Sequence, residues 1–264
     1  MRLTTSGTPP PVGRVHGVPP HSPDVTPSLR VPHQRRPVEA VLFDFHGTIA
    51  QVEDAVEWVL AAAAECGVAL DHIRATALAD QLVTVGRAGG PTPSRVPPHL
   101  AEVYAERDLR PAAHRAAYSG LAATVEAGID GLAEALYERL LRPEGWRAYA
   151  DTRPTLQALY AAGVPVAVVS NIGFDIRPLC EALGFAAYVS SWVLSYELGL
   201  CKPDPAIFRH ACRSLGVEPE QTLMVGDTPA DAAAVDAGCW ALVLPSGPPG
   251  AVNGLTAALS LALG

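Results

Sequence analysis

The stretch VEAVLFDFHGTIA (residues 38–50) opens with an apolar run that is typical of a buried β-strand. Near the end of that run Asp44 and His46 alternate with two phenylalanines, so both polar side chains point to the same face of the strand. Gly47 follows at once and lets the chain turn sharply. The strand is therefore expected to end by presenting a carboxylate and an imidazole side by side, which points to a functional site.

Further apolar, β-branched runs follow along the chain and alternate with helical patterns. The runs expected as strands are 164–171, 188–195, 222–227 and 239–244, and those expected as helices are 153–162, 176–183, 205–215 and 230–237. This alternation predicts an α/β fold with a doubly wound parallel sheet and right-handed crossovers. Ligands bind such sheets at the carboxyl ends of the strands, where Asp44, Ser170 and Asp227 all fall.

Residues 51–147 interrupt the alternation, because they are rich in alanine, helical in period and broken by a Gly/Pro segment at 86–98. We interpret them as an all-helical cap inserted after the first strand, so that residues 38–50 and 148–264 form the catalytic core. Residues 1–37 are rich in Pro, Ser, Thr and Gly without apolar periodicity, and we expect a disordered tail.

Composition excludes several classes of protein. The formal net charge of -8 argues against a nucleic-acid surface, and no apolar stretch is long enough to cross a membrane. The first residues show no signal-peptide pattern and the five cysteines form no CxxC pair, so we expect a cytoplasmic protein with reduced thiols. Among 19 Lys and Arg residues only Lys202 is a lysine, which suggests a position where arginine cannot substitute.

Four features at or just beyond the expected strand ends together predict a phosphoryl-transfer site. Asp44 is a candidate nucleophile, and the Ser170 hydroxyl and Lys202 ammonium are suited to hold phosphoryl oxygens. Asp227 and Asp231, in the segment GDTPAD, add carboxylates suited to Mg²⁺, a hard cation that prefers oxygen ligands. Each residue alone fits a turn, a helix cap or a surface charge equally well, so the prediction depends on their occurring together.

These segments resemble the four motifs of the haloacid dehalogenase superfamily. The resemblance covers about residues 38–247 and includes an insert at the position of the helical cap of one subclass. It implies that Asp44 is the nucleophile and that Lys202 binds phosphate and steadies the Asp44 carboxylate. The segments that carry it are FDFHGT (43–48), VVSN (168–171), GLCKPDPAIF (199–208) and VGDTPADAAAVDAG (225–238).

The same resemblance implies the remaining assignments. The cofactor would be Mg²⁺, bound by Asp44, the backbone carbonyl of His46 and Asp227, with Asp231 acting through the water shell of the ion. The resemblance also assigns substrate binding to Ser170, Asn171 and Lys202, and we add Thr48, from the turn after Asp44.

His46 departs from the family pattern, because phosphatases of the superfamily usually carry a second aspartate there to protonate the leaving oxygen and help activate water. An unperturbed imidazole has a pKa near ~6.5 and can perform either proton transfer. We therefore group His46 with Asp44 and Lys202 as catalytic. The alternative is that histidine is a poor substitute and hydrolysis is slow.

The cap is expected to supply specificity, since a cap closing over a site excludes water and contacts the leaving group. Its polar candidates are Arg95, His114 and Arg115. The favoured function is a Mg²⁺-dependent phosphatase acting on a small phosphorylated metabolite, as a monomer or homodimer. Two alternatives stay open: a metal-independent hydrolase of the dehalogenase type, and a low-turnover phosphate-binding or phosphotransfer protein.

Overall fold

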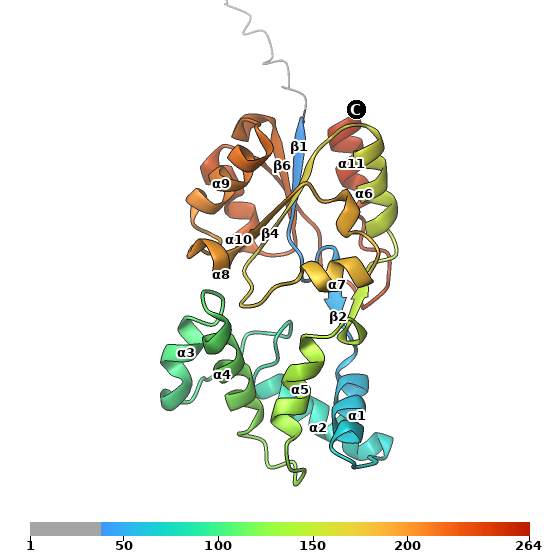
Figure 1. Cartoon of the computed structure of the whole chain (residues 1–264), viewed down its shortest axis with the longest axis vertical. Coiled ribbons are helices and arrows are strands. Elements are labelled where there is room, and N and C mark those ends of the chain that lie inside the picture. The colour runs from blue at the N-terminus through green and yellow to red at the C-terminus, as the bar shows by residue number, and fades with distance from the viewer. Residues whose placement is uncertain (1–37) are drawn as a thin grey trace, which may run out of the picture. The chain divides into compact units, whose positions relative to one another are not determined.

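A five-stranded parallel sheet forms the centre of the computed structural model, which describes residues 38–264 (Figure 1). The expected tail, residues 1–37, lies outside the described residues. Each of the five runs expected as strands forms one, with shorter ends. In sheet order the strands are β5 (Ser191–Leu194), β4 (Val166–Ser170), β1 (Ala40–Phe43), β6 (Thr222–Gly226) and β7 (Trp240–Val243).

The strand β1 is central and pairs in parallel with both β4 and β6. All four of its residues are fully buried, because helices cover both faces of the sheet (Figure 1). Val41 and Phe43 pack toward one layer, and Leu42 packs toward the other. The first layer contains α6 (Thr152–Ala161), α7 (Arg177–Ala182) and α11 (Thr256–Leu263), and the second contains α9 (Pro205–Leu215) and the 3₁₀ segment Ala233–Ala237. The expected doubly wound α/β fold is confirmed.

The segment between β1 and α6 folds into helices with an apolar core of their own, built around Trp58, Leu82 and Leu136. Two of these helices begin at aspartates, Asp54 and Asp71, whose side chains accept hydrogen bonds from the first backbone N–H groups. The helices are α1 (Ala55–Glu65), α2 (His72–Val85), α3 (Ala101–Ala105), α4 (Pro111–Ala122) and α5 (Leu132–Leu140).

A short antiparallel pair of strands, absent from the sequence-based expectation, joins the two ends of this helical segment. It consists of β2 (Ala50–Val52) and β3 (Trp146–Ala148). Strands of three residues are too short to show an alternation of apolar and polar residues, so they could not be predicted from the sequence. The segment expected to be wholly helical thus begins and ends in strands.

The remaining elements are short. The expected helix at 230–237 is divided between α10 (Pro229–Ala232) and the 3₁₀ segment that follows it, and α8 (Ser195–Leu198) follows β5. Among residues 38–264, no helix combines the length and the apolar character needed to cross a bilayer. Further 3₁₀ turns lie at Pro98–Leu100, Pro143–Gly145, Ala186–Tyr188 and Pro219–Gln221.

Candidate active site

Asp44 comes directly after β1, and its backbone N–H donates to Val225 of the neighbouring strand β6 at 2.9 Å. This bond fixes Asp44 at the carboxyl edge of the sheet. The Lys202 ammonium lies 2.6 Å from Asp44 Oδ1 and 2.6 Å from Asp231 Oδ1, and Lys202 is 5% exposed. The structure therefore brings these three residues, which are far apart in the sequence, into one buried ion cluster.

Asn171 positions Lys202 through two backbone hydrogen bonds. Its amide nitrogen donates to the Lys202 carbonyl at 2.8 Å, and its amide oxygen accepts from the Lys202 N–H at 2.7 Å. Each polar group of the Asn171 side chain thus makes one hydrogen bond to the main chain. One N–H of the amide is left for another acceptor, and the assignment of Asn171 to substrate binding stays a prediction. Ser170 ends β4 at the same edge of the sheet and is 2% exposed.

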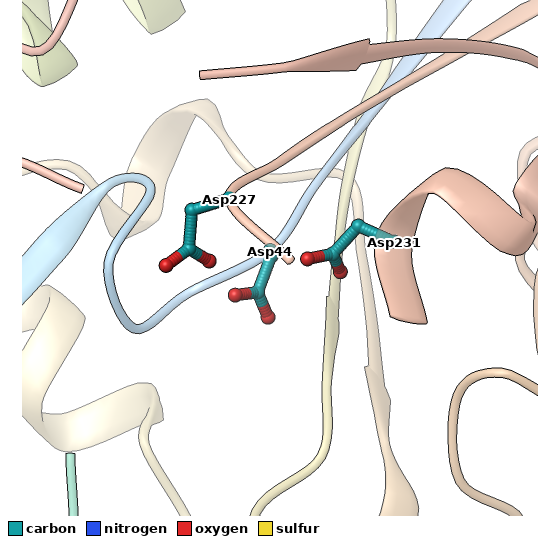
Figure 2. A group of neighbouring side chains, drawn as sticks. All are labelled: Asp44, Asp227 and Asp231. Carbon is teal, nitrogen blue, oxygen red and sulfur yellow. The ribbon is translucent and has the colours of Figure 1, made fainter. Parts of the chain in front are cut away.

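Asp227 completes a group of three carboxylates, shown in Figure 2, from each of which an oxygen lies within 4.8 Å of the others. Asp231 occupies the first turn of α10, where its Oδ2 accepts from Thr228 Oγ1 at 2.6 Å and from the Thr228 N–H at 3.0 Å. With Lys202 on its other oxygen, Asp231 is already held by donors of the protein. Asp44 and Asp227 accept fewer hydrogen bonds from side chains than Asp231 does. Asp44 accepts one from Lys202, and Thr48 Oγ1 lies 3.5 Å from Asp227 Oδ1.

Three carboxylates, of which Asp44 and Asp231 are buried and Asp227 is half-buried, lie beside one ammonium and leave this cluster with an excess of negative charge. Burial raises the pKa of Asp44 from 3.8 to about 7; Lys202 opposes that rise, and the carboxylates of Asp231 and Asp227 add to it. The pKa of Asp227 is also raised, chiefly by burial. Asp231 differs, because Lys202 and the Thr228 hydrogen bonds outweigh its burial and lower its pKa. An all-oxygen set with unbalanced negative charge fits a hard divalent cation such as Mg²⁺.

The turn after Asp44 requires glycine. Gly47 has φ of +80°, and a Cβ atom there would overlap the Asp227 carboxylate. Asn253, which the sequence reading missed, holds this turn by donating from its side-chain amide to the carbonyls of Gly47 (3.1 Å) and Thr48 (3.0 Å). A lone asparagine near the C-terminus carries no signal that would reveal this role.

The imidazole of His46 is held by groups that the sequence does not reveal. Its Nε2 lies 2.6 Å from Gln51 Oε1, which also accepts from the Val52 N–H, while Gln51 Nε2 donates to Ser246. Since that arrangement makes Oε1 an acceptor, Nε2 carries the proton and Nδ1 carries the lone pair. Gly89 of the cap packs so closely on this ring that a side chain there would overlap it.

These surroundings change the expected proton chemistry. Burial lowers the pKa of His46 from 6.5 to about 4, the positive charge of Arg87 lowers it further, and the Gln51 bond partly opposes this. At neutral pH the ring is therefore uncharged. An unperturbed imidazole would titrate near pH ~6.5, so these surroundings favour the neutral ring, and the part of His46 in proton transfer stays a prediction.

The three polar residues of the cap that were predicted to bind substrate occupy three different environments. The Arg115 guanidinium pairs with Glu134 and Glu138 within the cap, and Arg95 lines a surface pocket beside α4. His114 is 2% exposed; its Nδ1 lies 2.8 Å from the Tyr137 hydroxyl and its ring contacts Phe174 of the core. The structure thus places His114 between cap and core, and brings neither arginine to the carboxylate cluster.

Two other parts of the cap contact the site region instead. One is the loop around Gly89, which lies against His46. The other is the turn after α3, where the Asp108 carbonyl accepts from Ser195 Oγ and the Arg107 carbonyl packs against Gly173. Burial raises the pKa of Asp108, and the charges of Arg107 and Lys202 oppose that rise. The sequence analysis noted the first only as part of the Gly/Pro segment at 86–98 and assigned it no role, and it did not mention the second.

These features define a Rossmann-like α/β core with a helical insert. They are a parallel sheet with helices on both faces, a lysine-bound aspartate after its central strand, two further aspartates beside it and a helical segment after the first strand. The chain belongs to the haloacid dehalogenase-like hydrolases, since the model of that family matches residues 38–237.

Curated relatives match a shorter part of the chain. "Haloacid dehalogenase-like hydrolase domain-containing protein 3" of Danio rerio is 34% identical over 99 residues, which is 38% of this chain and 41% of that protein. The phosphoglycolate phosphatase of Rhodospirillum rubrum is 40% identical over 94 residues, or 35% of this chain and 39% of that protein. The chain thus spans about two fifths of the length of these relatives.

Among solved structures, a dehalogenase superposes with a TM-score of 0.58 at 23% identity, covering 85% of this chain and 96% of that one. At this level of identity the similarity demonstrates the shared fold alone.

Proposed function

We propose that the protein is a Mg²⁺-dependent phosphatase that acts on a small phosphomonoester through an aspartyl-phosphate on Asp44. The observation that carries this proposal is the cluster of Asp44, Asp227 and Asp231, in which Asp44 and Asp231 bind the Lys202 ammonium. Phosphatases among the relatives support it, including one named as a phosphoserine phosphatase, from Thermus thermophilus, that is 34% identical over 99 residues.

In the proposed reaction a carboxylate oxygen of Asp44 attacks phosphorus while the bond from phosphorus to the leaving oxygen breaks. Two of the three N–H donors of Lys202 are used by Asp44 and Asp231, so the third is free for a phosphoryl oxygen. Ser170, from the adjacent strand, is the candidate for a second oxygen. Water then cleaves the aspartyl-phosphate and restores the Asp44 carboxylate.

Mg²⁺ would be held by Asp44, Asp227 and the backbone carbonyl of His46, with Asp231 behind them. When bound, the ion neutralises negative charge on the phosphoryl group and on the carboxylates. The raised pKa values of Asp44 and Asp227 support this assignment, because a cation favours the ionised form of both.

The direct test is hydrolysis of p-nitrophenyl phosphate and of a panel of small phosphomonoesters, with Mg²⁺ and with EDTA. Phosphate release that EDTA abolishes and excess Mg²⁺ restores is the expected result. Dehalogenation of a 2-haloacid in EDTA would favour the metal-independent alternative. Binding of phosphate without turnover would favour the low-turnover alternative.

His46 provides a second prediction. With its pKa near 4, the ring is neutral at pH 7; its one proton, on Nε2, is hydrogen-bonded to Gln51, and Nδ1 can accept a proton. We therefore assign it to activating water against the aspartyl-phosphate. His46→Ala is expected to slow steady turnover roughly 100-fold, the usual value of a positioned base, and to produce a burst of leaving group before the slow phase. His46→Asp should recover most of the rate.

Rapid mixing with p-nitrophenyl phosphate and an alkyl phosphate provides the measurement. If His46 acts on water, the alanine variant slows both substrates to a similar steady rate, because dephosphorylation of Asp44 is common to both. A loss confined to the alkyl ester would instead make His46 the donor to the leaving group. An unchanged rate would make the residue a bystander.

A further inference from the structure

The guanidinium of Arg87 is buried in the cap without an anionic partner. Arg87 is 8% exposed, and its guanidinium carbon lies 4.2 Å from the centroid of the Trp58 ring. Within residues 38–264 its side chain makes no ion pair and no hydrogen bond. A cation–π contact attracts the charge but leaves the N–H donors without acceptors, so this site holds a cation that lacks an anion.

The two carboxylates whose charges act on Arg87 already bind other groups. Glu53 and Asp54 are the acids that act on Arg87. Glu53 accepts two hydrogen bonds from Arg139, at 2.5 and 2.8 Å, and Asp54 caps the first turn of α1. Arg139 therefore has a carboxylate partner that binds it through both oxygens, whereas Arg87, in the same cap, has no carboxylate partner. Removing a cation from water without such a partner is costly.

The position of Arg87 connects it to the active site. It belongs to the loop Gly86–Gly90, whose Gly89 lies against the His46 imidazole. The Arg87 side chain also lines a narrow cavity of about 20 Å³ together with Trp58, Tyr118 and Tyr137, which has room for about one water molecule. The Tyr137 hydroxyl in turn lies 2.8 Å from Nδ1 of His114, and the His114 ring contacts the ring of Phe174 in the core. Arg87 thus belongs to the cap loop that lies against His46, and it is near enough for its positive charge to act on that imidazole.

We propose that Arg87 binds a second anionic group of the substrate, so that the protein acts on phosphomonoesters of hydroxy acids in preference to those of neutral alcohols. The inference depends on the proposed phosphatase function and specifies its substrate class. A carboxylate on the leaving group would supply the acceptors that Arg87 lacks, and a guanidinium binds a carboxylate through two parallel N–H bonds. An ester of a neutral alcohol would leave the guanidinium without an anionic acceptor.

The test compares two small substrates that differ in the anion, 2-phosphoglycolate and ethyl phosphate. Their kcat/KM values are measured for the wild type, Arg87→Met, Arg87→Lys and a control, Arg74→Met, which removes an exposed arginine from the start of α2. The wild type and the control should prefer 2-phosphoglycolate. Arg87→Met should lower that preference roughly 10- to 100-fold, the usual value of hydrogen bonds to a charged group, mainly by slowing the carboxylate substrate. Arg87→Lys should keep part of the preference.

A thermal-shift arm distinguishes failure of this inference from failure of the proposed function. It measures the rise in Tm that each ester causes in the wild type and in the two Arg87 variants. If no ester is hydrolysed, the phosphatase proposal fails, yet a larger rise with 2-phosphoglycolate that Arg87→Met removes would still support the binding role. Equal effects of the two esters on the wild type, or a preference unchanged in either Arg87 variant, would overturn the inference. The wild-type comparison is decisive even if Arg87→Met does not fold.

Discussion

Replacing Asp44 with asparagine is expected to reduce phosphatase activity by about 10⁴-fold or more, the scale on which loss of a covalent catalyst is felt. The amide keeps the shape of the carboxylate but cannot attack phosphorus, and it removes one negative charge from the cluster with Asp227 and Asp231. The fold should therefore survive, and without metal the variant should be at least as stable as the wild type. Activity within tenfold of the wild type would contradict the assignment of the nucleophile.

The stability of the same variant should depend on pH in a defined direction. Because the folded pKa of Asp44 is raised from 3.8 to about 7, the folded wild type holds a proton between these pH values that the unfolded chain has lost. Protonation of Asp44 thus favours the folded state at low pH, and this contribution is lost as the pH rises through 7. In EDTA, the Tm of the wild type minus that of Asp44→Asn should fall from pH 5 to pH 8. A constant difference would contradict the raised pKa.

The sheet and the carboxylate cluster follow from the sequence, because a parallel sheet collects the ends of its strands at one edge. Asp44 and Lys202 are 158 positions apart, yet both could be assigned to that edge from the apolar runs alone. The strand ends predict which residues meet; they say nothing of how the side chains share their hydrogen bonds. The hydrogen bonds by which the Asn171 amide holds the main chain of Lys202, for example, could not be predicted from the strand ends.

The cap is where the sequence reading was weakest. Arg95, His114 and Arg115 were chosen for their charge and polarity, and periodicity does not reveal which helix face meets the core. The Arg115 guanidinium forms an ion pair with Glu134, which is 19 positions away on the next helix. The glycines around Arg87 were the usable signal, since a glycine-rich loop often marks a close backbone approach. Here that approach is to His46, whose lowered pKa depends on tertiary contacts and could not be predicted.

Replacing Lys202 is expected to have the second largest effect, even when its charge is kept. The ammonium nitrogen lies 2.6 Å from a carboxylate oxygen of Asp44 and of Asp231. A planar guanidinium is larger and directs its donors along a fixed fork, so it cannot occupy the same point between two acids and a phosphoryl oxygen. Lys202→Arg should therefore lower kcat/KM by roughly 100-fold or more, on the scale of losing one preorganised donor to the transition state.

Lys202→Met separates the charge of this residue from its shape. Without the ammonium, Asp44 and Asp231 face each other unpaired in a buried site, so the variant should lose about 3 kcal/mol or more of unfolding free energy in EDTA. Added Mg²⁺ should recover part of this loss, because it supplies the missing positive charge. Arg209→Lys, an exchange of cations on the exposed side of α9, should leave Tm and activity unchanged. Denaturant unfolding with and without Mg²⁺ measures these differences. If Lys202→Arg has the activity of the wild type, then any cation suffices at this position and the argument from the lone lysine fails.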